Sequence, residues 1–158
     1  MARFLVTGGG GFIGSNLVEA ILARGDSARV LDNFATGRRV NLAGAPAWAK
    51  AGGGAFELIE GDLRDLETCR RAVSGTDFVL HQAAIPSVPR SVKDPVESNR
   101  ANIDATLNVL VAARDAGVLR LAEIARAASP EIGVPEEECL SYLRDNLVFH
   151  LGPRQREG

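Results

Sequence analysis

Residues 3–14 read Arg3-Phe4-Leu5-Val6-Thr7-Gly8-Gly9-Gly10-Gly11-Phe12-Ile13-Gly14. The apolar run predicts a buried strand, the glycines a tight turn, and the residues from Phe12 to about Arg24 a helix. Such a turn presents backbone N–H groups at a helix N-terminus with no Cβ in the way, as a dinucleotide pyrophosphate requires. The spacing fits both G-x-x-G-x-x-G (Gly8, Gly11, Gly14) and G-x-G-x-x-G (Gly9, Gly11, Gly14), and a ligand-free tight turn is the alternative.

Asp32 strengthens the dinucleotide interpretation. It ends the next apolar run, 28–32, eighteen residues beyond Gly14. Dinucleotide-binding folds place a carboxylate about 20 residues on, where it accepts hydrogen bonds from ribose hydroxyls. A carboxylate there repels a 2′-phosphate, so NAD is favoured over NADP, although Arg38 and Arg39 moderate the preference. The alternative is an ordinary aspartate at the start of a loop.

Short apolar runs alternate with helical patterns as far as residue 118. The expected strands are 3–7, 28–32, 55–60 and 77–81, and the expected helices are 12–24, 66–73 and 95–116, with Gly117 as the last helix's cap. Residues 36–54 are rich in alanine and glycine and predict a loop with at most a short helix. Strands alternating with helices predict an α/β fold, a truncated Rossmann-like domain whose four-stranded parallel sheet has the order 3-2-1-4.

The pattern changes after Val118. Apolar residues then recur at helical spacing as far as Ala128, Ser129-Pro130 interrupts them, and Pro135 opens a second helix with Leu140, Leu143 and Leu147 on one face. The sequence therefore predicts a helical pair in place of a fifth strand. We expect two parts, a dinucleotide-binding half at 1–118 and a helical tail at 119–158 packed on it.

Composition narrows the classes of protein. The chain has 158 residues, suiting one domain, and a net charge of −2, which gives no electrostatic support for nucleic-acid or anionic-membrane binding. No apolar run approaches the ~18 residues of a membrane span. Cys69 and Cys139 lie far apart, without metal-ligand spacing, so no metal site is expected and a cytoplasmic location is predicted.

Five ordered motifs over residues 1–118 resemble the extended short-chain dehydrogenases, specifically the NAD-dependent nucleotide-sugar epimerases and most closely their UDP-N-acetylglucosamine 4-epimerase branch. They are the glycine stretch 7–14, Leu31-Asp32-Asn33 with Thr36-Gly37-Arg38-Arg39, the run 60–65 (EGDLRD), the run 81–91 (HQAAIPSVPRS) followed by Asp94-Pro95, and the run 106–118 (TLNVLVAARDAGV).

The resemblance implies roles for matching residues in binding NAD. Gly8, Gly11, Phe12, Ile13 and Gly14 would form the pyrophosphate turn. On the adenosine side, Asp32 and Asn33 would contact the ribose, and Asp62 and Leu63 would bracket the adenine, with Asp62 accepting from its amino group. Gln82, Ala83 and Ala84 would line the nicotinamide-side ribose, with Asn102 near the family's helix asparagine. Arg90 and Ser91 would face a weakly bound sugar nucleotide.

The family's catalytic residues have no counterpart in this sequence. Epimerases need a tyrosine base with a lysine four residues later. The single tyrosine here, Tyr142, is followed at that distance by Asn146, and the lysines, Lys50 and Lys93, both precede it. His81, at a strand end, is expected to be a packed residue and His150 a surface one. No catalytic residue is therefore assigned.

The tail resembles a second family. Residues 135–149 and Leu151-Gly152-Pro153 are similar to the C-terminal helices of menaquinone-pathway chorismate dehydratases, which suggests a chimera joined near Val118. A missing fifth strand would leave the outer edge of the fourth strand unpaired, so we expect the tail or a second copy of the chain to cover it. A homodimer through that edge follows as a prediction.

Three functional hypotheses remain. The first is an NAD-binding fragment of a nucleotide-sugar 4-epimerase that does not turn over a substrate alone. The second is a chimeric or designed chain that folds without retained activity. The third is an enzyme completed by a partner chain that supplies the tyrosine and lysine. Both Asp32 and Asp62 favour the first, since folding alone requires neither.

Overall fold

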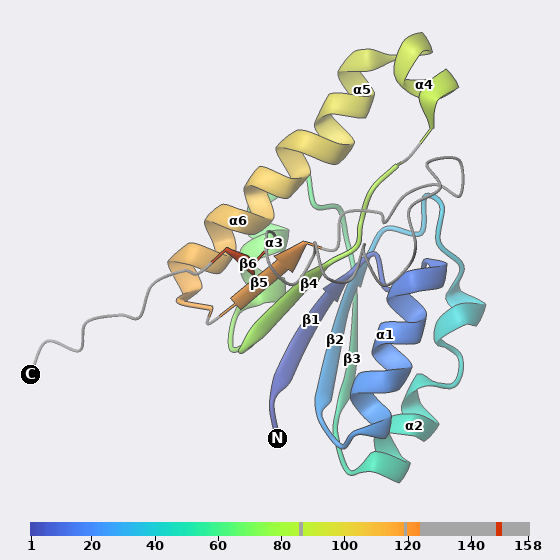
Figure 1. The fold of residues 1–158 in the computed structure, drawn as a ribbon, viewed down its shortest axis with the longest axis vertical. Coiled ribbons are helices and arrows are strands. Elements are labelled where there is room, and N and C mark those ends of the chain that lie inside the picture. Colours follow the sequence, from blue (N-terminus) through green and yellow to red (C-terminus); the bar gives the residue numbers. More distant parts are fainter. Residues whose placement is uncertain (86, 119, 124–147, 150–158) are drawn as a thin grey trace, which may run out of the picture.

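The computed structural model describes residues 1–85, 87–118, 120–123 and 148–149, which form one twisted sheet with helices on both faces (Figure 1). The strand order is β3-β2-β1-β4-β5-β6, with β1–β5 parallel and β6 antiparallel to β5. The strands are β1 (Arg3–Thr7), β2 (Ser27–Asp32), β3 (Phe56–Glu60), β4 (Phe78–His81), β5 (Arg120–Glu123) and β6 (Val148–Phe149). The predicted order 3-2-1-4 is confirmed.

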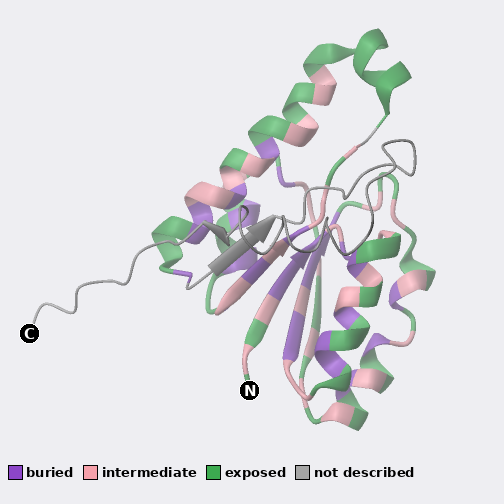
Figure 2. Ribbon diagram, viewed as in Figure 1, coloured by how far each residue is buried: buried purple, intermediate pink, exposed green. Residues whose placement is uncertain are grey.

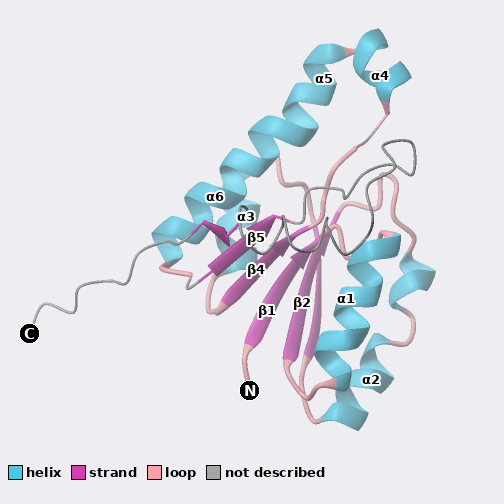
Figure 3. Cartoon of the chain, in the orientation of Figure 1, coloured by secondary structure: helices cyan, strands magenta, loops and turns pink. Residues whose placement is uncertain are grey.

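The helices follow the strands in the alternation that the sequence predicts (Figure 3). They are α1 (Phe12–Ala23), the 3₁₀ turn η1 (Arg39–Leu42), α2 (Ala45–Gly52), α3 (Leu66–Val73), α4 (Val88–Lys93), α5 (Pro95–Asn99), the π-helical turn η2 (Arg100–Asp104) and α6 (Ala105–Ala116). Gly117 ends α6 in the left-handed conformation, at φ 66°, as expected of its C-terminal cap.

Successive residues of the central strands serve opposite faces of the sheet, as the two-residue period of a strand requires. Leu5 belongs to the apolar cluster under α3 and α6, whereas its neighbour Val6 belongs to the cluster under α1 and α2. In the same way Leu31 and Val30 of β2 divide between the two clusters. Burial therefore concentrates along β1 and β2 and the inner faces of the helices (Figure 2). The inner residues of these strands, 4–6 and 30–31, are accordingly apolar.

The expected helix 95–116 is continuous in direction but changes its winding. The π-helical turn Arg100–Asp104 separates α5 from α6. A π turn inserts one extra residue into a helix and rotates the side chains beyond it, and it commonly occurs at functional sites. No residue of α5 or of η2 is buried, so this end of the helix stands away from the sheet.

The expectation of a helix directly after Val118 is wrong. Residues 120–123 form β5, which pairs in parallel with β4 in the register Val79↔Leu121 and Leu80↔Ala122. The apolar spacing of so short a segment does not separate helix from strand, and the free N–H and C=O groups along β4 supply a partner. The edge of β4 is therefore paired, which removes the premise of a homodimer through it. Residues 124–147, which carry most of the predicted helical pair, lie outside the described residues.

Helix α4 is absent from our sequence prediction. Its N-terminus is capped by the Ser87 side chain, which accepts from the backbone N–H of Arg90, and Pro89 lies in its first turn. None of its residues is buried. In a helix of six residues, Val88 and Val92 are too few to give a periodic signal, and both are exposed, so the capping serine and the proline were the available clues.

In the part of the chain that the structure describes, none of the helices combines the length and apolarity needed to span a bilayer.

The N-cap of α3 allows a test of the local structure. The Asp65 carboxylate accepts from the backbone N–H groups of Glu67 and Thr68 and from the Thr68 hydroxyl. Replacing it in Asp65→Ala should lower the free energy of unfolding by about 1 kcal/mol and the melting midpoint by about 2–4 °C. Thermal denaturation measures this, with Glu19→Ala, on the exposed face of α1, as the control. Equal midpoints for the two variants would contradict the capping role.

Candidate functional site

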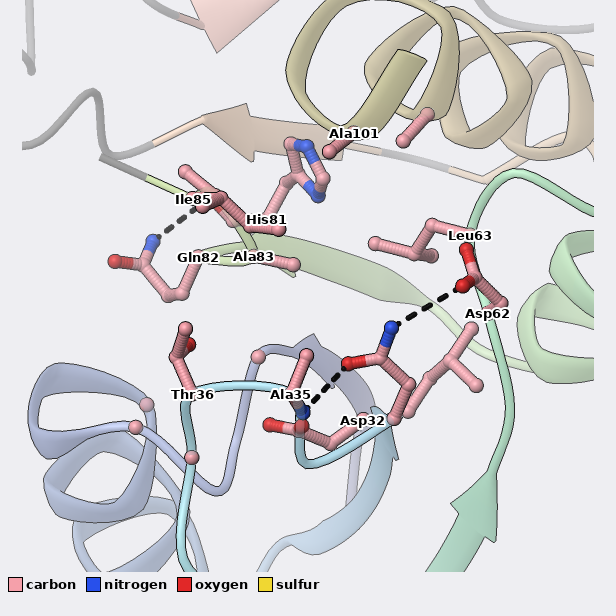
Figure 4. Close-up of a pocket in the computed structure, with 18 of the residues that line it drawn as sticks. Asp32, Ala35, Thr36, Asp62, Leu63, His81, Gln82, Ala83, Ile85 and Ala101 are labelled. Atoms are coloured by element: carbon pink, nitrogen blue, oxygen red, sulfur yellow. Dashed lines mark hydrogen bonds between the residues drawn. The ribbon is translucent and has the colours of Figure 1, made fainter. Parts of the chain in front are cut away.

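A cleft of about 390 Å³ opens at the carboxyl ends of the parallel strands. This is the edge of an open α/β sheet at which ligands bind, beside β1, where the chain reverses the direction in which strands are added. Figure 4 shows Asp62 and Leu63 on one side of the cleft and Gln82 and Ala83 on the other. All but one of the residues predicted to bind NAD line it: Gly8, Gly11, Phe12, Ile13, Gly14, Asp32, Asn33, Asp62, Leu63, Gln82, Ala83 and Ala84. Arg90 and Ser91, predicted to face a sugar nucleotide, do not line it and are exposed on α4.

The glycine turn is set by close packing. Gly8 has φ +69°, and a Cβ on it would lie 2.7 Å from the Cα of Ala83. A Cβ on Gly14 would lie 2.3 Å from the carbonyl oxygen of Gly8. Gly9 instead packs against Val30 and does not line the cleft. The structure therefore favours the interpretation based on Gly8, Gly11 and Gly14.

The N-terminus of α1 faces the cleft without a side-chain cap. Its N-cap is Gly11, and no acidic residue lies in its first turn. The first N–H groups of an α-helix have no partner within the helix and carry the positive end of its dipole. A Cβ on Gly11 would have one neighbour within 4 Å, the Gly8 carbonyl oxygen at 3.2 Å, so the space beyond it is open. Phe12, beside this opening, is 83% exposed.

Asp32 ties the end of β2 to this turn. The residue is 8% exposed, its Oδ2 accepts from the Gly10 N–H at 2.7 Å, and its Oδ1 accepts from the Phe34 N–H at 2.7 Å. Each carboxylate oxygen can accept two hydrogen bonds, so both keep acceptor capacity towards the cleft. Of the two nearby arginines, Arg39 forms an ion pair with Glu60 and its guanidinium lies over the Phe34 ring.

Asp62 is more fully occupied than the sequence suggests. Its carboxylate accepts four hydrogen bonds: two from the Arg64 side chain, one from the Arg64 backbone N–H and one from the Asn33 amide. These bonds, above all those from the Arg64 guanidinium, hold the pKa of Asp62 at about 2. Arg64 also pairs with Glu97 on α5. Because a carboxylate offers about four acceptor positions, a further donor must displace one of these bonds.

His81 is the centre of the opposite side of the cleft. The residue is 3% exposed, and burial lowers its pKa to about 4. Its Nδ1 lies 2.6 Å from the Thr7 hydroxyl and its Nε2 lies 3.0 Å from the Thr106 hydroxyl. The expectation of a packed residue at this strand end agrees with these contacts. The ring is neutral and both of its nitrogens already make hydrogen bonds, so His81 is not free to act as a base.

Asn102 lies behind the cleft lining. Its Oδ1 accepts from the Ile85 N–H at 2.7 Å and its Nδ2 donates to the Ile85 carbonyl at 3.1 Å. The amide thus holds the loop that follows β4. Our sequence analysis missed Thr106 and Asn108, whose side chains hold the Asn102 carbonyl and the Leu63 carbonyl respectively. Thr106 follows Asn102 by four residues and so shares its helix face, which was the available signal for Thr106.

These parts fit a dinucleotide. An uncapped helix N-terminus with an open approach suits the pyrophosphate, and a buried carboxylate at the end of the neighbouring strand suits a ribose. One wall of the cleft belongs to β2 and β3 and the other to β4, so the glycine turn lies between places for two nucleosides. The volume of the cleft, about 390 Å³, falls within the range of small-molecule and cofactor sites.

Residues 4–133 match the family described as "NAD dependent epimerase/dehydratase family". The chain belongs to this family. Among curated proteins, UDP-glucose 4-epimerase of Streptomyces lividans is 38% identical over 138 residues, which cover 85% of this chain and 38% of that protein. The chain thus spans under two fifths of the length of this relative.

Solved structures agree with the family assignment. UDP-glucose 4-epimerase of Thermus thermophilus in complex with NAD has a TM-score of 0.65 and 45% identity, covering 75% of this chain and 36% of the enzyme. The dTDP-glucose 4,6-dehydratase of Streptomyces venezuelae with NAD bound has a TM-score of 0.67 and 36% identity, over 75% of this chain and 38% of the enzyme. The family match continues to residue 133, which is beyond the joint near Val118 that a chimera would require. The match therefore gives no support to a joint at that position.

Burial of His81 predicts a defined pH dependence of stability. Its pKa is about 4 in the folded chain against an ordinary 6.5. Between pH 4 and pH 6.5 the imidazole is therefore neutral in the folded chain and protonated in the unfolded chain, so each chain takes up a proton as it unfolds. The stabilising contribution is complete above pH 6.5, and it falls by about 1.4 kcal/mol per pH unit as the pH drops towards 4. Asp62 has a pKa of about 2 against an ordinary 3.8, so its contribution to the free energy of unfolding is lost only below pH 3.8, outside the range in which His81 titrates.

Urea denaturation at pH 7, 6 and 5 measures this slope. His81→Gln should lower stability at pH 7 but reduce the slope, because glutamine does not titrate. The remaining titratable groups are common to both proteins and cancel in the comparison. Parallel pH profiles for the wild type and the variant would contradict a buried neutral His81.

Proposed function

We propose that this chain binds NAD in the cleft at the carboxyl ends of β1, β2 and β4. The observation that carries the proposal is the uncapped N-terminus of α1 behind Gly11, with the buried carboxylate of Asp32 beside it. The family membership and the NAD complexes of its structural relatives support the same cofactor. NAD is preferred over NADP because Asp32 repels a 2′-phosphate and the nearby Arg39 is paired with Glu60.

The two sides of the cleft then take different halves of NAD. The adenosine ribose lies at Asp32 and Asn33 and the adenine between Asp62 and Leu63. Gln82, Ala83 and Ala84 line the nicotinamide-side ribose, and the pyrophosphate crosses the turn formed by Gly8, Gly11, Phe12, Ile13 and Gly14. Asn102 acts from behind, through the backbone of Ile85.

Adenine recognition requires a small rearrangement. Asp62 accepts four hydrogen bonds, so the adenine amino group must displace one donor. The Asn33 amide makes the longest of the four, at 3.2 Å, while the Arg64 guanidinium makes a bond of 2.6 Å. Asn33 is the donor we expect to be released, which frees its amide for the ribose it is predicted to contact.

The proposed role is binding without turnover by these 158 residues alone. Bound NAD supplies hydride exchange, which in nucleotide-sugar epimerases oxidises and re-reduces sugar C4. The tyrosine base and its lysine are not among these residues, since Tyr142 is followed by Asn146 at the fourth position. A sugar nucleotide is the proposed second ligand, bound weakly near Arg90 and Ser91. The narrower N-acetylglucosamine branch and the cytoplasmic location stay predictions.

Thermal denaturation of the full chain with and without NAD tests the proposal. At 100 times Kd, NAD should stabilise the native state by about 2.7 kcal/mol, which raises the midpoint by several degrees. Gly11→Ala places a methyl group where the pyrophosphate would lie, and its single close neighbour is the Gly8 carbonyl oxygen at 3.2 Å. This variant should fold and lose the NAD shift.

The outcomes separate the hypotheses. A wild-type shift that Gly11→Ala abolishes supports an NAD-binding fragment. A cooperative melt that millimolar NAD leaves unmoved in the wild type favours the alternative, a folded chain, chimeric or designed, without retained activity. Copurification with a second chain carrying a Tyr-x-x-x-Lys motif would favour an enzyme completed by a partner.

A further inference from the structure

The loop after β4 is held at both ends by hydrogen bonds among neutral groups, of which Thr7 and His81 are buried and Thr106 and Asn102 half-buried. The Thr7 hydroxyl accepts from the Gln82 N–H at 3.2 Å and from the Ala83 N–H at 3.3 Å. At the other end, the Asn102 amide holds both the N–H and the carbonyl of Ile85. The His81 ring joins these two ends, through Thr7 on one side and Thr106 on the other.

The hydrogen positions along this chain follow from its donors and acceptors. The Thr7 oxygen already accepts from two backbone N–H groups, so its own hydrogen is donated to His81 Nδ1. The Thr106 hydroxyl donates to the Asn102 carbonyl at 2.6 Å, so it accepts from His81 Nε2. His81 is therefore the neutral tautomer with its hydrogen on Nε2, accepting on one nitrogen and donating on the other.

We propose that His81 is a positioning residue for the nicotinamide half of the NAD site, acting with Thr7 and Thr106 to set the loop 82–85 against the glycine turn. This inference rests on the proposed function. Its effect is local to one half of the cleft, because Asp32 and Asp62 on the adenosine side make no hydrogen bond to this chain of groups within the described residues.

The loop 82–85 has little room to move. Gly8 and Ala83 are so close that a Cβ on Gly8 would lie 2.7 Å from the Ala83 backbone. The loop cannot move towards the turn without a clash, and the bonds through Thr7 and Asn102 oppose movement away from it. The backbone at Gln82, Ala83 and Ile85 is thus held from two sides, as a preorganised binding wall requires.

The test compares two ligands on single-hydroxyl variants. ADP carries the adenosine and the two phosphates alone, whereas NAD also engages the loop 82–85. Thr106→Val removes the acceptor for His81 Nε2 with little change in volume, and Thr106→Ser restores a hydroxyl. Thr76→Val is the matched control, because the Thr76 hydroxyl also donates to a backbone carbonyl within its own segment, that of Val73, away from the cleft.

Calorimetric titration should give a selective loss. Thr106→Val is expected to weaken NAD binding by about threefold to tenfold, the loss of one hydrogen-bonded link, and to leave ADP binding unchanged. Thr106→Ser should bind NAD as the wild type does, and Thr76→Val should keep the wild-type ratio of NAD to ADP affinity. His81→Leu, which removes both the acceptor for Thr7 and the donor to Thr106, should repeat the NAD-selective loss.

Two results would overturn the inference, and they are distinguishable. If the wild type binds NAD but Thr106→Val and His81→Leu leave the NAD to ADP affinity ratio unchanged, His81 only stabilises the fold. If the wild type binds neither ligand, the proposed function fails and the inference fails with it.

Discussion

The close approach of the glycine turn to β4 governs the rest of the site. Gly8 lies against the backbone of Ala83, and Gly14 lies against the carbonyl of Gly8, so neither position accommodates a Cβ. Because β1 and β4 are parallel neighbours with Thr7 opposite His81, the start of α1 and the end of β4 lie at the same edge of the sheet, and this contact holds them close together. The open N-terminus of α1, the carboxylate of Asp32 and the loop 82–85 then converge on one cleft.

The two walls of that cleft are built by different physical means. On the adenosine side, half-exposed charges cluster around Asp62, with Arg64 linking it to Glu97. Exposed ion pairs contribute little to stability and rearrange readily, which suits a wall that must release a donor when a base binds. On the other side, neutral groups hydrogen-bonded to the buried His81 form a fixed wall. Buried and fully satisfied polar networks favour a single geometry.

Much of this arrangement could be predicted from the sequence, because strong local patterns decide it. The run 3–7 and the helix 66–73 have the predicted bounds in the structure, since each has a complete apolar pattern between clear boundaries. Strand β5 was missed because Val118, Leu121, Ala122 and Ala125 fit a helical spacing, although the alternation of strands and helices called for a strand that could pair with β4. Asn102 lies in a π-helical turn and bonds the backbone of Ile85, and no pattern in the sequence indicates either the turn or this partner.

The most direct measurement of the central claim is a crystal structure of the full chain grown with NAD. The account predicts the pyrophosphate at the N-terminus of α1, with the adenosine half towards Asp32 and Asp62 and the nicotinamide half against residues 82–85. The Asn33 amide should have left Asp62. NAD bound in the reversed direction or outside this cleft, or a cleft left empty at saturating NAD, would contradict the account.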